Sequence, residues 1–458
     1  MIKNLIKRSP SKIKRPISNI YYRIPDYFRY GKEFRKNYKF LKESQFWSEK
    51  KLEEYQLNQL KKLIKHAYET VPYYTKLFNN NNIKVSDINS FNDLKKIPYL
   101  TKEIIQDNLE DLISNKYNKQ KIDYVTTGGS TGTPMGFYID KKYDFEREWA
   151  FIANMWERVG YNVKSDNRMI ILRGDIPENS FYEYKNNKLI LSSFSIEKNI
   201  NEYINLIENY EPDFIQAYPS AIIIISNYIN SNNIKIKLKK LKAIICGSEN
   251  INENQRKDIE QAFNTRVYTF YGHTEHSCIG GECEKSNFYH LNSEYGYTEI
   301  IDKNGFEVKT EDKVGELVVT GFNNYVVPFI RYKTSDMAVV TNKKCTCGRN
   351  YRLIKKIEGR KQEYFVNSMN ERVIFTWADY PLWQCKDKIW SYQYIQNNPG
   401  EVELNIHFKD NNEIYDLKKI EEAFKKYYKN IKININIVNN INRTKRGKFK
   451  YIIQNIKV

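Results

Sequence analysis

The sequence has no long hydrophobic run. Its longest aliphatic stretch, 221–225, is far shorter than the ~20 residues that a membrane-spanning helix needs. The first residues, MIKNLIKRSPSKIKRPI, are basic but lead neither to an apolar segment nor to a small-residue cleavage site, so they do not read as a secretory signal. We therefore expect a cytoplasmic protein without a transmembrane helix.

Cysteine is scarce, with six in 458 residues. In a reducing compartment these cysteines are expected to be thiols or metal ligands rather than disulfides. The zinc-finger spacing of C-x2-C with H-x3-H is missing, as are a helix-turn-helix signal and an RNA-recognition motif. The sequence thus offers no recognised nucleic-acid-binding module.

Acidic residues are too few to balance the basic ones, since 74 Lys+Arg against 55 Asp+Glu leave a formal net charge of +19. Such an excess suits nucleic acid, anionic lipid or small anions as partners. The simpler interpretation is a lysine-rich solvated surface. Part of the excess lies in residues 1–40, which are also rich in aromatic side chains. They predict either a peripheral membrane arm or a basic strap on the protein's own surface.

The chain does have enough hydrophobic residues, 41%, to fold, and its length predicts two to four domains. Helical periodicity marks 48–71, which stops before Pro72, and 144–159; short strands are expected at 169–172, 241–245, 315–321 and 336–342. This alternation predicts an α/β body with partly parallel, mixed sheets. After residue 360 the pattern becomes a small α+β unit. We expect an arm at 1–40, a large domain at 41–360 and a small domain at 361–458.

A glycine- and hydroxyl-rich loop lies between two β-prone flanks in YVTTGGSTGTPMGFY, residues 124–138. Glycines let backbone N–H groups approach an anion, and hydroxyls add donors. The loop lacks the order of a P-loop or of a dinucleotide fingerprint. It predicts a phosphate site or, alternatively, a flexible hairpin turn. The candidate residues are Thr127, Gly128, Gly129, Ser130, Thr131, Gly132 and Thr133.

This loop resembles the phosphate-binding motif of adenylate-forming enzymes, specifically the phenylacetate-CoA ligase family and its branch found in capsular-polysaccharide gene clusters. Further motifs follow in the family's order: Gly247-Ser248-Glu249, Tyr271-Gly272-His273-Thr274-Glu275, Arg331 to Asp336 (RYKTSD), Arg352, Glu358-Gly359-Arg360, and Arg446-Gly447-Lys448-Phe449. The similarity covers residues 47–458. It implies the adenylate-forming fold, with a large body and a mobile C-terminal domain.

The resemblance implies that a substrate carboxylate attacks the α-phosphate of ATP, giving an acyl-adenylate and pyrophosphate. It assigns Glu275 to Mg²⁺ and Thr274 to the α-phosphate. Tyr271 and Gly272, with Gly247, Ser248 and Glu249, are implied at the adenine side, Asp336 at the ribose, and Arg352 near ribose and phosphate. Such a site needs cations and donors where charge develops.

Lys448 is implied as the mobile positive charge of the first reaction. The alternative is an ordinary solvated basic run, because Lys445, Arg446 and Lys450 surround it. In the family the small domain then rotates to form a thioester with CoA. The corresponding hinge, Gly359 to Glu363, lacks the aspartate of many adenylate-forming enzymes.

Four cysteines and a histidine lie in two short segments, Cys278 to His290 and Cys345 to Cys347. Zn²⁺ takes four S or N ligands in a closed tetrahedron, so a structural zinc site is attractive; buried free thiols are the alternative. The resemblance selects Cys283, His290, Cys345 and Cys347, with Cys278 as a substitute ligand.

Two acceptors fit the activated acid: CoA, or an amine or hydroxyl on a sugar precursor for surface polysaccharide. The expected partners are a small-molecule carboxylic acid and one of these acceptors, without nucleic acid. The hypothesis from a different class is a non-catalytic basic protein of the same fold that binds nucleic acid or a membrane surface.

Overall fold

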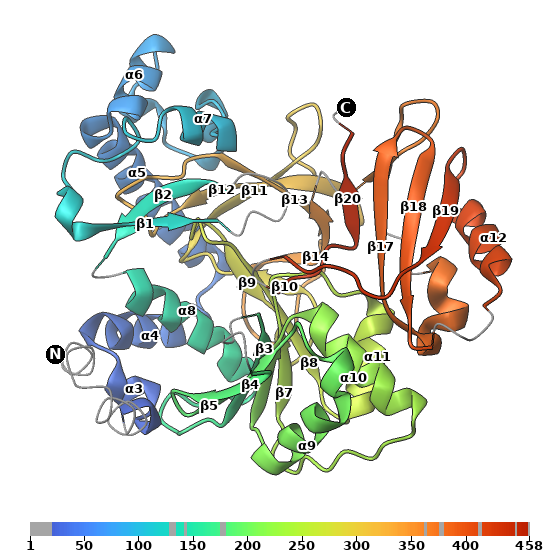
Figure 1. Ribbon diagram of the computed structural model, residues 1–458. Helices are drawn as coiled ribbons and strands as arrows, with labels where there is room; N and C mark the ends of the chain where they lie inside the picture. The colour runs from blue at the N-terminus through green and yellow to red at the C-terminus, as the bar shows by residue number, and fades with distance from the viewer. Residues whose placement is uncertain are drawn as a thin grey trace. The chain divides into compact units, whose positions relative to one another are not determined.

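The computed structural model describes residues 21–127, 134–141, 144–174, 180–360, 364–374, 380–410, 415–444 and 447–456. The chain forms two compact units (Figure 1). Unit 1 combines Met1–Asn167 with Tyr268–Glu358, and unit 2 combines Arg168–Val267 with Gly359–Val458. This division differs from the expected boundary at residue 360 alone, because a segment of the expected large domain belongs to the same unit as the tail.

The α-helices that the structure describes in unit 1 are α3 (Asp26–Arg29), α4 (Lys32–Ser44), α5 (Glu49–Thr70), α6 (Pro72–Asn80), α7 (Lys102–Asp107) and α8 (Asp144–Trp156). Helix α5 confirms the helix expected at 48–71. The Ser48 side chain caps it by accepting from the backbone N–H of Lys51 at 3.3 Å. Pro72 then opens α6, as its fixed φ and missing N–H favour. Helix α8 ends at Trp156, three residues before the expected boundary, and continues as a 3-10 turn.

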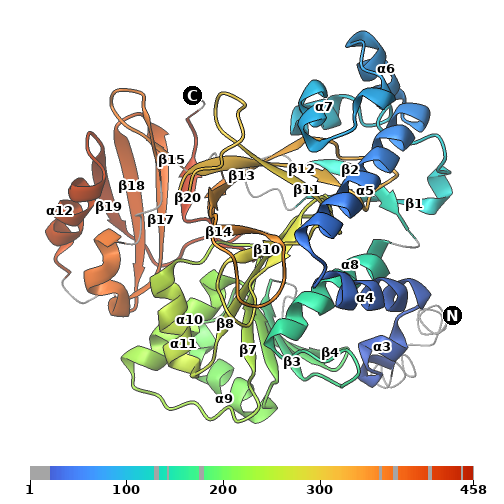
Figure 2. The ribbon, with the colours of Figure 1, turned by 180° about the vertical axis from the view of Figure 1, so that it is seen from behind.

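The larger sheet of unit 1 has the strand order β11-β12-β13-β14-β10-β9-β8. Its strands are β8 (Val267–Gly272), β9 (Ile279–Gly281), β10 (Tyr289–Leu291), β11 (Gly296–Ile301), β12 (Val314–Gly321), β13 (Tyr332–Val340) and β14 (Arg352–Arg360). Helix α5 runs along this sheet beside β11 (Figure 2) and buries its apolar face in the core. A separate hairpin pairs β1 (Ile122–Thr126) with β2 (Gly136–Asp140).

Residues 21–40 are part of the fold of unit 1 rather than a detached arm. Helix α4 packs against α8 and buries Phe34 and Tyr38. The Glu146 carboxylate of α8 accepts from the backbone N–H groups of Gly31 (3.0 Å) and Phe34 (3.4 Å), which places a negative charge at the N-terminus of α4. Residues 1–20 lie outside the described residues.

In unit 2, five strands take the order β7-β6-β3-β5-β4, and β3 pairs in parallel with both β5 and β6. The strands are β3 (Met169–Arg173), β4 (Tyr182–Lys185), β5 (Lys188–Ser192), β6 (Phe214–Ala217) and β7 (Ala243–Cys246). Helices α9 (Ile200–Tyr210), α10 (Pro219–Ser231) and α11 (Glu253–Phe263) pack beside them (Figure 1). The α/β fold with partly parallel sheets is confirmed.

The tail of unit 2 is a four-stranded sheet of order β19-β18-β17-β20, with α12 (Leu417–Tyr427) on one face (Figure 1). Its strands are β17 (Ile389–Asn398), β18 (Glu401–Phe408), β19 (Lys432–Ile437) and β20 (Ile452–Gln454), and a small hairpin joins β15 (Tyr364–Val366) to β16 (Arg372–Ile374). Ile420 and Phe424 of α12 are buried on the sheet. The expected α+β tail is confirmed. Among the helices of the described ranges, none is long and apolar enough to cross a membrane.

Candidate active site

Glu275 lies in the turn that follows β8 in unit 1. One carboxylate oxygen, Oε2, is 3.2 Å from Nδ1 of His273, and the other, Oε1, accepts from the Tyr332 hydroxyl at 3.2 Å. Burial alone raises the pKa of Glu275, but the His273 ring and the hydrogen bonds outweigh it and hold the pKa below its ordinary value. Glu275 is therefore ionised at neutral pH and has the chemistry of a Mg²⁺ ligand.

Tyr271 and Asp336 form a second part of the same cluster. The Tyr271 hydroxyl donates to Oδ2 of Asp336 at 2.7 Å. Burial, and then the negative charge of Asp336, raise the pKa of Tyr271 well above its ordinary value; the charge of Glu275 acts in the same direction. Tyr271 thus stays a neutral hydrogen-bond donor to Asp336.

The backbone is left-handed where these carboxylates are presented. Ser335, which precedes Asp336, has φ +64°, and His276, which follows Glu275, has φ +51°. Residues other than glycine rarely adopt such angles. Where they do, contacts with the surrounding structure hold the backbone in this conformation. Asp336 is held further because its backbone N–H donates to Oγ1 of Thr334 at 3.0 Å. Both carboxylates therefore lie on locally constrained backbone.

Arg331 of the RYKTSD motif is a structural residue. It is 3% exposed, and its guanidinium donates to both carboxylate oxygens of Glu299 at 3.0 and 2.9 Å and to the carbonyl oxygen of Ile97 at 2.8 Å. Its guanidinium also lies over the Tyr99 ring, 4.3 Å from the centroid. A buried charge is tolerated only when it is paired and hydrogen-bonded, so these contacts explain how a charged arginine can be buried at this position.

Arg352 lies at the start of β14 and has partners of its own. It donates to the carbonyl oxygen of Thr298 at 2.8 Å and forms an ion pair with Glu307 at 3.3 Å. These contacts hold the side chain in place. Its expected role at ribose and phosphate stays a prediction, as does the role of Thr274, which lies in the turn beside Glu275.

The glycine loop joins β1 to β2. Its first residue, Thr127, is tied to Met135: the Thr127 N–H donates to the Met135 carbonyl at 2.8 Å, and the Met135 N–H donates to Oγ1 of Thr127 at 3.0 Å. The flanks therefore form the hairpin that the sequence allowed. Gly128, Gly129, Ser130, Thr131, Gly132 and Thr133 lie outside the described residues, and phosphate binding by this loop stays a prediction.

Gly247, Ser248, Glu249 and Lys448 belong to unit 2. Ser248 has φ +69°, and the Glu249 carboxylate accepts from two backbone N–H groups, those of Ser220 (3.0 Å) and Phe449 (2.9 Å). The Lys448 ammonium nitrogen is 5.9 Å from the centroid of the Tyr218 ring, at the limit of a cation–π contact. Glu249 is thus linked to the residue next to Lys448.

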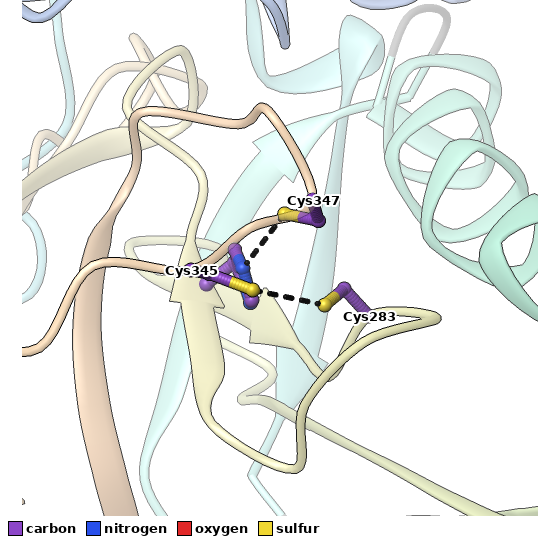
Figure 3. Close-up of side chains that lie close together, drawn as sticks. Cys283, Cys345 and Cys347 are labelled. Carbon is purple, nitrogen blue, oxygen red and sulfur yellow. Dashed lines mark hydrogen bonds between the residues drawn. The ribbon is translucent and has the colours of Figure 1, made fainter.

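Four sulfur and nitrogen atoms converge in unit 1, as Figure 3 shows for the cysteines. Cys283 follows β9, His290 lies in β10, and Cys345 and Cys347 lie between β13 and β14; their ligand atoms all lie within 4.8 Å of one another. The Sγ atoms of Cys283 and Cys345 are 3.5 Å apart, and Sγ of Cys347 is 3.3 Å from Nε2 of His290. In a zinc tetrahedron two thiolates lie about 3.8 Å apart.

The hydrogen bond of the His290 ring also fits a tetrahedral metal site. Nδ1 of His290 is 3.0 Å from the carbonyl oxygen of Phe288, which leaves Nε2 facing the sulfurs, as in metal-bound histidines generally. Cys278 does not join the cluster. Its Sγ lies 3.5 Å from Oγ1 of Thr298, and burial raises the pKa of its thiol to about 12. Its expected role as a substitute ligand has no support in this arrangement.

Sequence reasoning missed Tyr332 and Glu299. Tyr332 belongs to the RYKTSD motif, which assigns it no role, yet its hydroxyl contacts Glu275. Glu299 is one of many acidic residues, and only the fold shows that it pairs with Arg331. The motif itself was the available signal for Tyr332, whereas nothing in the sequence distinguishes Glu299.

Comparisons with known proteins agree with the motifs. The CapK C-terminal domain family matches residues 365–455. The chain is 26% identical to protein CapK of Staphylococcus aureus over 94% of both chains. It is 23% identical to a phenylacetate-coenzyme A ligase of Thermus thermophilus, covering 79% of this chain and 82% of that protein. The crystal structure of a 2-hydroxyisobutyryl-CoA ligase with an acyl-AMP matches with a TM-score of 0.69, at 18% identity, over 87% of this chain and 88% of that one. The resemblance and the adenylate-forming fold are thereby confirmed.

Proposed function

We propose that this protein is an AMP-forming ligase that activates a small carboxylic acid with ATP. The observation that carries the proposal is a pair of carboxylates on constrained backbone, Asp336 with Tyr271 as its neutral donor and Glu275 with Tyr332 as its donor. In this scheme Glu275 holds Mg²⁺, which neutralises charge on the phosphate oxygens, and Asp336 accepts from ribose hydroxyls. Thr274, the glycine loop and Lys448 act on the phosphates.

The activated acyl group passes to CoA or to an amine or hydroxyl acceptor. A role of this reaction in surface-polysaccharide synthesis rests on the resemblance of the motifs to the branch found in capsular-polysaccharide gene clusters, and CoA as acceptor rests on the similarity to CoA ligases. The similarity to CapK indicates no acceptor, so the acceptor has to be measured.

A screen of aromatic, aliphatic, hydroxy and amino acids with ATP and Mg²⁺ tests the proposal. We expect at least one acid to support release of pyrophosphate, measured with and without CoA. Product formation with a nucleotide sugar but without CoA would identify a sugar-linked acceptor. If no acid released pyrophosphate while the protein bound DNA or anionic vesicles, the non-catalytic basic protein would replace the ligase.

We propose that Cys283, His290, Cys345 and Cys347 hold a structural Zn²⁺. Three thiolates and one imidazole fill a closed site, which gives the ion no open position for catalysis. Such an ion links the strands β9 and β10 to the loop between β13 and β14.

We also propose that the protein is cytoplasmic and that it contacts an anionic membrane peripherally through its N-terminal region. Residues 1–40 contain 12 lysines and arginines against two acidic residues and so carry +10 of the net charge of +19. In α4, Lys32, Lys36 and Lys39 are exposed along one face, and no ion pair joins them to another described residue. Phe28 nearby is 63% exposed. Basic and aromatic side chains together suit an anionic lipid interface.

Replacing Lys32, Lys36 and Lys39 together by serine is expected to weaken binding to phosphatidylserine-containing vesicles about a hundredfold at low salt, at about 1 kcal/mol per lysine. Co-sedimentation measures it. The matched control replaces three exposed lysines of α5, namely Lys50, Lys61 and Lys62, with the same change in net charge. Equal losses in both triple variants would mean binding through net charge alone, and retention on DNA but not on vesicles would indicate a nucleic-acid surface; either contradicts the proposal.

A further inference from the structure

The backbone on both sides of Lys448 is fixed by unit 2. On one side, the Gly447 carbonyl accepts from the Ser193 hydroxyl at 3.0 Å. On the other, the Phe449 N–H donates to Oε1 of Glu249 at 2.9 Å. Within the turn, the Lys448 N–H donates to Oγ1 of Thr444 at 3.1 Å. The lysine is therefore presented from a docked turn.

The fit at Gly447 shows how close the docking is. Gly447 has φ +76°, and a Cβ placed there would come within 2.6 Å of Cα of Gly174 and 2.3 Å of Oγ of Ser193. Any larger residue would push the turn off this surface. The position of Lys448 therefore depends on the contacts that its two neighbours, Gly447 and Phe449, make with unit 2.

The Phe449 N–H donates to a charged group, the Glu249 carboxylate, whereas the other two contacts of this turn involve the hydroxyls of Ser193 and Thr444. Its second oxygen, Oε2, accepts from the Ser220 N–H at 3.0 Å, at the N-terminus of α10, where a negative charge is stabilised. Burial raises the pKa of Glu249, although the two backbone N–H groups and the nearby Arg443 oppose this. The carboxylate thus joins the fixed end of a helix to the residue after Lys448.

We propose that Glu249 is a positioning residue that holds the turn of Lys448 in its docked position during acid activation. The inference rests on the proposed function and deepens it. It replaces the adenine-side contact that the resemblance implies for Glu249 with a contact to the catalytic turn. Because a displacement of about 1 Å can cost about 10²-fold in rate, a loosened turn is costly even with Lys448 present.

Hydrogen exchange of the protein without substrates tests the contact itself. In Glu249→Ala, the amide of Phe449 loses its acceptor, so this amide, followed in peptides that begin before Gly447, should take up deuterium at least tenfold faster. Glu249→Gln keeps one acceptor oxygen and should lie between this variant and the wild type. Glu202→Gln, at an exposed position of α9, is the matched control and should change nothing. Unchanged exchange in Glu249→Ala overturns the proposal.

Kinetics then distinguish positioning from adenine binding. With an acid found in the screen, Glu249→Ala should lower kcat for acyl-AMP formation about 10²-fold with little change in KM for ATP, and the conservative Glu249→Gln should recover part of it. A raised KM for ATP with unchanged kcat overturns the proposal in favour of an adenine contact. Should no acid react with the wild type, the proposed function fails, and the exchange measurement still decides whether Glu249 holds the turn.

Discussion

Replacing Lys448 by alanine is expected to lower the rate of acyl-AMP formation by about 10²–10³-fold while leaving the fold intact. In the proposed reaction two anions meet, the acid's carboxylate and the α-phosphate of ATP, and a positive charge between them stabilises the transition state more than the ground state. Loss of a single such group costs this order of magnitude in other enzymes. Release of pyrophosphate or ATP–pyrophosphate exchange, with the acid identified in the screen, measures the effect.

Two further variants separate a specific role of Lys448 from a general basic surface. Lys450→Ala removes the same charge two residues away and should retain nearly full activity. Lys448→Arg keeps the charge but changes its shape and reach, so only partial activity is expected. Equal losses in Lys448→Ala and Lys450→Ala, or an unchanged rate in Lys448→Ala, would leave Lys448 as part of an ordinary basic run. Circular dichroism confirms that each variant is folded.

The elements of the fold were predictable where local signals agree. Helix α5 has an N-cap at Ser48, apolar residues at helical spacing and a proline directly after its end. The tail has alternating strands and one strongly amphipathic helix, α12, whose Ile420 and Phe424 face the sheet. Each of these features depends on neighbours within a few residues, so the sequence alone is sufficient to reveal them.

The partners of the site residues were not predictable, because they are far apart in the chain. Glu275 meets a tyrosine 57 positions later, and the carboxylate of Glu249 meets a backbone N–H 200 positions later. The left-handed backbone at Ser335 and His276 has no local sequence signal, since neither residue is a glycine. The motifs therefore indicate which residues belong to the site, whereas the contacts that hold those residues come from the tertiary structure.

The segments that make up each unit were likewise not predictable from the sequence alone. A change in composition near residue 360 suggested a boundary, and the tail does form its own sheet. However, Arg168–Val267 shares a unit with that tail, partly through contacts such as those of Ser193 and Glu249 with the Lys448 turn. Composition reports where the chain changes character, whereas packing decides which segments form a unit.

Removing one ligand of the proposed zinc site is expected to destabilise unit 1 by several kcal/mol. Binding of a structural metal adds directly to folding free energy, because its ligands come together only in the folded chain. Cys345→Ala should therefore lose its zinc and unfold about 10 °C lower, on the scale expected for units of this size. Metal analysis of protein purified without chelator should give about one zinc per chain for the wild type, and thermal unfolding followed by circular dichroism measures the shift.

Cys278→Ala is the matched control for this variant. Cys278 is a buried thiol of the same unit, but its sulfur lies against Thr298 outside the cluster, so its loss should cost only the small cavity left behind and should keep the zinc. The two cysteines thus separate loss of the metal from loss of a buried sulfur. Wild-type protein without zinc, or equal destabilisation by both substitutions, would leave the cluster as a group of free thiols. In that case the half-buried Cys345 and Cys347 should react with a thiol reagent without prior chelation.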